Sequence, residues 1–224
     1  MLINEQNVAY RRRLVKVCQK MHINHFVRGT SGNVSVRIPD GVLVTPSGIR
    51  YEEMKPSDIV HLDMEGNICC NEWIAESKTT PTSEWHLHLA ILTARPDVNA
   101  VIHSHPRFAT TIAVLEQEIP AIHYMLGIVN GNKVPCAPYR TFGTKELSDV
   151  VVETMGDRRA CLLAHHGMVV AASDLWQAFD MTIQVEAMAE LYWRSCAIGD
   201  PKSLDDEEMN RVRAKFKTMN YGPQ

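Results

Sequence analysis

Histidines are concentrated in the middle of the chain, at positions suited to binding a metal ion. Seven of the ten lie between positions 86 and 166. His103 and His105 stand two residues apart at the end of a predicted strand over 98–103, just before Pro106. Alternate residues of a strand point to one face, so both imidazoles can converge on one ion. The alternative is a pair of half-exposed histidines at a strand end, without a ligand.

A third candidate ligand, His166, comes from a second predicted strand over 160–164. The run His165-His166-Gly167 ends that strand and turns tightly enough to present one imidazole. Neighbouring side chains point opposite ways, so we expect His165 to have a structural role. His86 and His88 lie two residues apart on a predicted helix and do not share a face, so we interpret both as surface or supporting groups.

Glu84 lies in the first turn of that same helix, for which Thr80 is the predicted N-cap and Pro81 the first helical residue. One interpretation is an acid in the first turn that stabilises the positive end of the helix dipole. The other is a carboxylate that completes a three-histidine site or acts as a base beside it. In the second case the hydroxyl groups and amides of Thr82 and Ser83 bind an anion at the helix N-terminus.

Two loops rich in small residues offer further anion-binding groups. The segments 29–33 (Gly-Thr-Ser-Gly-Asn) and 45–48 (Thr-Pro-Ser-Gly) place hydroxyl and backbone N–H groups where a phosphate can approach closely. Either loop alone also has the composition of an ordinary turn. Together with Thr82 and Ser83 at the predicted helix N-terminus and with the histidines, they indicate a site for a phosphorylated ligand.

These groups must be positioned by a mixture of strands and helices. Hairpins come early, over 34–44 and 59–70, and later elements mix helix and strand without strict alternation. The predicted fold is therefore α/β, with a mostly antiparallel or mixed sheet covered by helices. Further strands are expected at 119–125 and 168–171, and helices at about 4–24, 106–115, after Thr144, from Ser173 to about 198, and 204–218.

Length and composition predict one domain, residues 1–224. The chain has 23 Lys and Arg against 26 Asp and Glu, a net charge of −3, and no block of like charge. This balance argues against nucleic acid or a membrane surface as a partner. No segment is typical of a signal peptide or a spanning helix, so we expect a soluble cytoplasmic protein whose six cysteines are buried free thiols.

Seven short runs together resemble the class II aldolase family of the L-fuculose-1-phosphate aldolase type. They match the family in order and spacing over about residues 5–220. The runs are Gly29-Thr30-Ser31-Gly32-Asn33-Val34-Ser35, Thr45-Pro46-Ser47-Gly48, Pro81-Thr82-Ser83-Glu84-Trp85, His103-Ser104-His105, Ile122-His123-Tyr124-Met125, Thr141-Phe142-Gly143-Thr144 and His165-His166-Gly167.

This resemblance implies a three-layer α/β/α subunit in a fourfold homotetramer, with active sites at subunit interfaces. It implies one zinc ion per subunit, held by His103, His105 and His166, with Glu84 as ligand or base. Tyr124 matches a tyrosine that a neighbouring subunit contributes to the site. The positions that match the family's phosphate-binding residues are Thr30, Gly32, Asn33, Ser47, Gly48, Thr82 and Ser83.

The implied reaction is reversible cleavage of a ketose 1-phosphate between C3 and C4, which gives dihydroxyacetone phosphate and an aldehyde. Zinc acts as a Lewis acid on the substrate oxygens. Glu84 then moves the proton on the nucleophilic carbon, and Tyr124 takes the C4 hydroxyl proton. No Schiff-base lysine is needed.

Two departures from the family pattern bear on closure of the site and on the aldehyde. Met219 and Asn220 separate the run Lys215-Phe216-Lys217-Thr218 from Tyr221-Gly222, whereas family members join the two directly. Arg140 stands where fuculose-type members tend to carry a small residue, so the aldehyde pocket is expected to differ.

Other activities remain open on the same motifs. An aldolase for 5-deoxyribulose or 5-methylthioribulose 1-phosphate would share all of them, and a methylthioribulose-phosphate dehydratase is a further relative. A ribulose-phosphate 4-epimerase carries Asp where Glu84 stands, which favours the aldolase. A metal-free binding module like the adducin head lacks the ligand histidines, which are present here.

Overall fold

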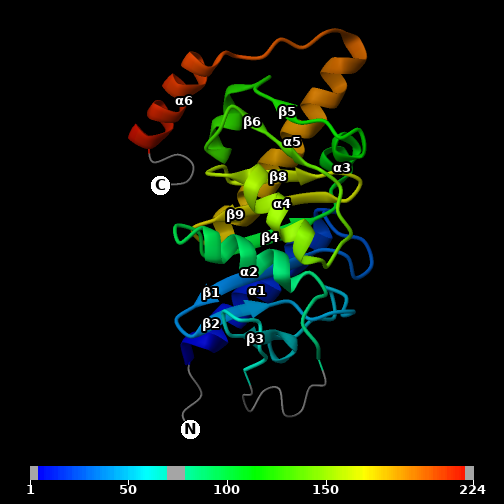
Figure 1. Cartoon of the computed structure of the whole chain (residues 1–224), viewed down its shortest axis with the longest axis vertical. Coiled ribbons are helices and arrows are strands. Elements are labelled where there is room, and N and C mark those ends of the chain that lie inside the picture. The colour runs from blue at the N-terminus through cyan, green and yellow to red at the C-terminus, as the bar shows by residue number, and fades with distance from the viewer. Residues whose placement is uncertain (1–4, 70–78, 220–224) are drawn as a thin grey trace.

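The structure of the protein is a computed structural model that describes residues 5–69 and 79–219. Seven strands form one sheet in the order β3-β2-β1-β4-β9-β8-β7, and β5 and β6 form a separate pair (Figure 1). The strands are β1 (Asn33–Ile38), β2 (Gly41–Val44), β3 (Val60–Leu62), β4 (Ala100–Ser104), β5 (Ile119–Pro120), β6 (Lys133–Val134), β7 (Cys136–Ala137), β8 (Ala160–Leu163) and β9 (Gly167–Ala172).

Helices cover both faces of the sheet. They are α1 (Glu5–Ile23), α2 (Trp85–Ala94), α3 (Arg107–Val114), α4 (Lys145–Met155), α5 (Leu175–Ile198) and α6 (Asp206–Thr218), with two 3₁₀ helices, η1 (Pro56–Asp58) and η2 (Tyr124–Val129). The buried side chains of α1, α3 and α5 pack on one face, and those of α2 and α4 on the other (Figure 1). Every pair in the large sheet is antiparallel except β7 with β8. The expected three-layer, mostly antiparallel fold is confirmed.

Alternation along β1 and β4 brings polar residues to the α2 face. Val34 of β1 and Ile102 of β4 join the core beneath α1 and α5. Because side chains along a strand alternate, Asn33 and Ser35 lie on the opposite face with His103. In the register of the two strands Asn33 is directly opposite His103. The sheet thus places three buried polar side chains side by side beneath α2.

A short bridge ties the segment before α2 to the loop after β2. Pro46 and Pro81 form an isolated antiparallel bridge. Two backbone hydrogen bonds flank it: Ser47 N–H to Thr80 O at 2.9 Å, and Thr82 N–H to Thr45 O at 3.0 Å. The bridge holds the two small-residue segments against each other.

This bridge makes the predicted start of α2 wrong. The helix begins at Trp85, with Glu84 as its N-cap, so Thr80 is no cap and Glu84 does not lie in the first turn. The backbone around Pro81 is already paired with the 45–47 loop and cannot adopt helical dihedrals at the same time. Glu84 does not cap the helix with its side chain either. Its carboxylate is therefore available for another role.

Other boundaries differ less. The strand predicted over 119–125 is wrong beyond β5, because Pro120 has no N–H for the ladder and η2 begins at Tyr124. The helices expected after Thr144 and from Ser173 are α4 and α5, whose N-caps are Thr144 and Asp174. The strand expected at 98–103 is shifted to β4.

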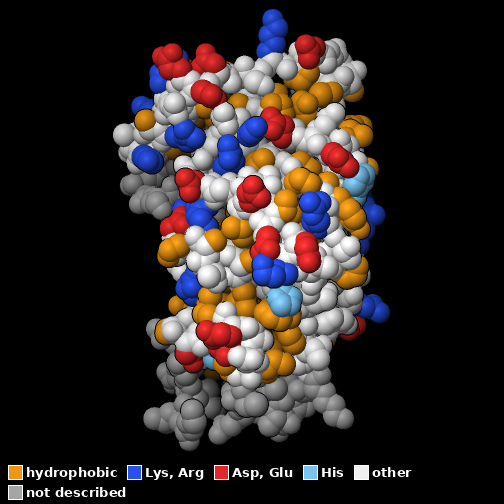
Figure 2. Space-filling model, in the orientation of Figure 1, with side chains coloured by type: hydrophobic (Ala, Val, Ile, Leu, Met, Phe, Trp, Pro, Cys, Tyr) orange, Lys and Arg blue, Asp and Glu red, His pale blue; other side chains and the backbone are white. Residues whose placement is uncertain are grey.

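Charges of both signs are interspersed on the face shown in Figure 2, as the net charge of −3 predicts. Cys18 and Cys161 are buried free thiols as expected, whereas Cys136 is only partly buried and Cys196 is exposed. Among the described helices none is long and apolar enough to cross a bilayer. The end of the second hairpin at Cys70 and the Tyr221-Gly222 pair lie outside the described residues.

Candidate active site

One cavity of about 450 Å³ collects nearly all the residues predicted from the sequence to form the site. Its walls come from the β1 entry loop, the 45–48 loop, the segment before α2, and the ends of β4 and β8. The predicted site residues that line it are Thr30, Gly32, Asn33, Ser47, Gly48, Thr82, Ser83, Glu84, His105 and His166. His103 is fully buried beside them.

The three histidines converge as expected. One ring nitrogen from each of His103, His105 and His166 lies within 4.8 Å of the others. His103 Nδ1 is 2.9 Å from the carbonyl oxygen of Met168. A carbonyl only accepts, so Nδ1 carries the proton and Nε2 presents a lone pair. This Nε2 is 2.9 Å from His105 Nε2.

The donor set fits a divalent metal ion. Glu84 Oε2 lies 3.2 Å from His103 Nε2, and Glu84 Oε1 lies 3.5 Å from His166 Nε2. Glu84 Oε1 is buried and accepts no hydrogen bond in the described chain. Burial lowers the pKa of each histidine, that of His105 to about 3, so the imidazoles are neutral, as metal binding requires. Three neutral nitrogens and one carboxylate are a usual ligand set for such an ion.

Gly167 allows His166 to approach the end of β4. A Cβ at this position would lie 2.5 Å from Ser104 O and 2.6 Å from His105 Cδ2. The neighbouring His165 has a φ of 55° and turns away, with its Nε2 2.9 Å from Glu116 Oε1. His166 alone therefore joins the triad from this turn, as predicted.

Asn33 and His88 support Glu84 from behind. Asn33 Nδ2 donates to Glu84 Oε2 at 2.9 Å, and Asn33 Oδ1 is 2.6 Å from His88 Nε2. His88 Nδ1 is in turn 2.7 Å from Ser35 Oγ. Only helical spacing was available from the sequence, and it did not reveal that His88 is 1 % exposed and linked to the site. Burial lowers the pKa of His88 to about 4, so the ring is neutral.

The cavity also presents unpaired backbone donors. The N–H groups of Gly32, Gly48 and Ser83 donate no hydrogen bond within the part of the chain that the structure describes. Gly32 has a φ of 81°, and a Cβ there would lie 2.6 Å from Val27 Cγ1. Backbone N–H groups without partners, beside hydroxyl groups in one cavity, can form an anion-binding concavity. This part of the cavity is suited to a phosphate.

Tyr124 lies elsewhere on the subunit. It is 49 % exposed, and it lines a groove beside α6 together with Met125 and Phe216. Its ring centroid is 6.2 Å from that of Phe216. Within one chain the structure therefore does not bring Tyr124 to the histidines.

Two aromatic residues at the cavity mouth were missed by the sequence analysis. Tyr139 and Phe142 line the cavity with Arg140 and are 52 % and 63 % exposed. Their positions on both sides of Arg140, the residue that departs from the family pattern, were the available signal. The three residues give this part of the wall both apolar surface and a positive charge.

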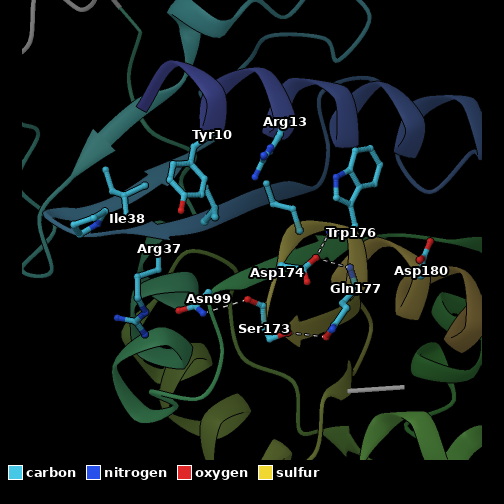
Figure 3. A pocket seen from close by; sticks show the side chains of 13 residues that line it. Tyr10, Arg13, Arg37, Ile38, Asn99, Ser173, Asp174, Trp176, Gln177 and Asp180 are labelled. Atoms are coloured by element: carbon cyan, nitrogen blue, oxygen red, sulfur yellow. Dashed lines mark hydrogen bonds between the residues drawn. The ribbon is translucent and has the colours of Figure 1, made fainter. Parts of the chain in front are cut away.

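A larger cavity of about 700 Å³ lies between α1, β1 and the start of α5 (Figure 3). Its polar groups are largely paired with each other. Asn99 donates to Ser173 O, Ser173 donates to Gln177, and Asp174 accepts from the N–H groups of Trp176 and Gln177 (Figure 3). The smaller cavity contains the histidine triad and the unpaired backbone N–H groups, so we take it as the candidate active site.

A three-layer fold in which three histidines and a buried carboxylate converge beside loops of small residues is an arrangement suited to a divalent metal ion next to an anionic ligand. Residues 12–193 match the family described as "Class II Aldolase and Adducin N-terminal domain". The chain belongs to this family, and it is a carbon–carbon lyase. Class II aldolases depend on a metal ion, and the three converging histidines are a group that could hold one.

Three relatives illustrate the similarity. The 5-methylthioribulose-1-phosphate/5-deoxyribulose-1-phosphate aldolase of Rhodospirillum rubrum is 44 % identical over 97 % of this chain and 95 % of its own. The L-fuculose phosphate aldolase of Escherichia coli K12 is also 44 % identical, over 94 % of both chains. A solved L-fuculose 1-phosphate aldolase superposes with a TM-score of 0.88 at 38 % identity and covers 97 % of this chain and 98 % of its own.

Proposed function

We propose that residues 1–224 form a single domain that reversibly cleaves a ketose 1-phosphate to dihydroxyacetone phosphate and a small aldehyde. The observation that carries this proposal is one cavity holding the triad, Glu84 and three unpaired backbone N–H groups. The relatives' names support it, because L-fuculose, 5-methylthioribulose and 5-deoxyribulose phosphates are all ketose phosphates. The residues proposed to bind the phosphate are Thr30, Gly32, Asn33, Ser47, Gly48, Thr82 and Ser83.

Cleavage between C3 and C4 leaves an electron pair on C3, which becomes an enediolate. A zinc ion held by His103, His105 and His166 would polarise the C2 carbonyl and stabilise the developing charge. Glu84 lies beside the triad and moves the proton to and from C3. The loops that line the same cavity as Glu84 would hold the phosphate and so orient C3 toward the carboxylate.

Tyr124 completes the reaction from a second copy of the chain. It is proposed to take the C4 hydroxyl proton, and its distance from the triad within one chain requires a neighbouring subunit to supply it. Half of its surface is exposed, so it is available to another subunit. We therefore propose a homotetramer with active sites between subunits.

The active enzyme is expected to sediment as a tetramer at assay concentration. Tyr124→Phe is expected to lower cleavage by about 10²-fold or more, because it removes the acid–base hydroxyl. The comparison is made by sedimentation velocity and by turnover on the same preparation. A monomer with full activity would contradict both the assembly and the role of Tyr124.

Loss of the Ser83 hydroxyl should weaken binding of the phosphate. Ser83→Ala is expected to raise KM by about tenfold with little change in kcat, because a ground-state contact is removed. Initial-rate kinetics on the sugar phosphate provide the measurement. Ser203→Ala, an exposed serine outside the cavity, is the matched control. An unchanged KM would remove Ser83 from the phosphate site.

The substrate is tested by release of dihydroxyacetone phosphate. The zinc-loaded protein is incubated with the 1-phosphates of L-fuculose, L-rhamnulose, 5-deoxyribulose and 5-methylthioribulose, and product is followed in each. The last two compounds are the second candidate substrates. The relative named for them is as similar to this chain as the fuculose enzyme is, at 44 % identity each. No release from any of the four would refute the proposed aldolase.

A further inference from the structure

A buried row of hydrogen bonds runs behind Glu84 and crosses from β1 to α2 and back. Ser35 Oγ is hydrogen-bonded to His88 Nδ1 at 2.7 Å, and His88 Nε2 is hydrogen-bonded to Asn33 Oδ1 at 2.6 Å. Asn33 Nδ2 donates to Glu84 Oε2 at 2.9 Å. All four side chains are at most 6 % exposed. Ser35 and His88 do not line the cavity, so they act on the substrate only through their neighbours.

The chemistry of the four groups gives this row one direction. The Glu84 carboxylate can only accept, so Asn33 turns its NH₂ group toward it and its Oδ1 toward His88. Asn33 Oδ1 also only accepts, so His88 Nε2 carries the ring proton. His88 Nδ1 then accepts from the Ser35 hydroxyl. A neutral His88 has one ring proton to donate, and its burial keeps it in that form.

The row makes the two oxygens of Glu84 different. Oε2 accepts from Asn33 and lies 3.2 Å from His103 Nε2. Oε1 accepts no hydrogen bond from the described residues. A carboxylate without such a tether rotates and exchanges its two oxygens. The hydrogen bond from Asn33 therefore fixes Oε1 as the oxygen that accepts no hydrogen bond from the described residues and lies 3.5 Å from His166 Nε2.

We propose that Ser35 and His88 are positioning residues that act through Asn33 to hold Glu84, so that Oε1 is the oxygen that accepts the substrate proton. The inference rests on the proposed function, because it names the reacting atom of the proposed base. It also gives Asn33 a role beyond the phosphate contact. One N–H of its amide is committed to Glu84, and the other remains for the ligand.

Two substitutions at His88 distinguish a role in positioning Glu84 from a purely structural role, in which His88 only forms hydrogen bonds with buried polar groups. The amide of Gln reaches the place of Nε2 and can still donate to Asn33, whereas the amide of Asn reaches only the place of Nδ1. His88→Asn therefore removes the donor to Asn33, and His88→Gln keeps it. His86→Asn is the matched control, because His86 is exposed on the same helix and stacks on Trp85.

The measurements use the full-length, zinc-loaded protein. They are kcat, KM, and exchange of the C3 hydrogen of dihydroxyacetone phosphate with deuterated water. His88→Asn is expected to lower kcat and the exchange rate by about 10–100-fold and to change KM by less than about twofold. His88→Gln should recover most of both rates, and His86→Asn should match the wild type.

A purely structural role gives another result. His88→Asn would then lower the melting temperature but keep wild-type kcat and exchange per folded enzyme, which would overturn the proposal. If His88→Asn does not fold, Ser35→Ala provides the test and is expected to slow exchange about fivefold, the equivalent of one hydrogen bond. A wild-type exchange rate in Ser35→Ala would also overturn the proposal. Absence of exchange in the wild type would instead refute the proposed function.

Discussion

Replacing Glu84 by Gln is expected to lower kcat by about 10²–10⁴-fold, the usual contribution of a general base. The amide keeps the shape of the carboxylate, and three histidines remain for the metal, so folding and metal content should change little. The decisive measurement is exchange of the C3 hydrogen of dihydroxyacetone phosphate with deuterated water. This exchange requires the base and the metal but no aldehyde.

Glu116→Gln is the matched control for that experiment. It removes the same charge close to the site, at the carboxylate that pairs with His165 rather than with the triad. Its exchange rate is expected to stay within about twofold of the wild type. A Glu84→Gln enzyme that exchanges at the wild-type rate with metal bound would eliminate Glu84 as the base.

Removal of one triad histidine is expected to lower catalysis by a factor comparable to that of Glu84→Gln. His103→Ala is expected to lose the metal from near one ion per subunit to a small fraction, and to lower kcat/KM by about 10³-fold or more, since a catalytic metal supplies several kcal/mol. Elemental analysis of the dialysed protein and initial rates are the measurements.

His165→Asn controls for the loss of an imidazole near the site. Asn tolerates the left-handed backbone conformation that His165 adopts, so the turn is retained. This variant is expected to keep its metal. Full metal content in His103→Ala would show that the triad is not the binding site.

The convergence of the three histidines and the fold class could be predicted because both depend on local periodicity. A spacing of two residues at the end of a strand places the side chains of His103 and His105 on the same face. The turn at Gly167 determines the position of His166. The order of strands and helices likewise follows from hydrophobic patterns of short range.

The start of α2 could not be predicted, since the competing interaction is distant in sequence. Thr80-Pro81 is a good helix start in isolation, yet its backbone pairs with the loop at 45–47. For the same reason the sequence could not decide whether His88 is a surface group or, as the structure shows, a group that supports the site. Its partners, Ser35 and Asn33, are more than fifty residues away on another element.

The pairing of Asn33 with His103 ties the chemistry to the register of β1 on β4. Deleting one residue from the 36–38 part of β1, with the β2 end of the strand held in place, would slide Asn33 and Ser35 by one position and turn both to the α1 side, since faces alternate at every residue. Gly32 would then stand in the place of Asn33 behind Glu84. The turn between β1 and β2, at 39–40, lies at the far end of the strand and can absorb a change of length. Viable insertions and deletions are therefore expected at that turn and not inside β1.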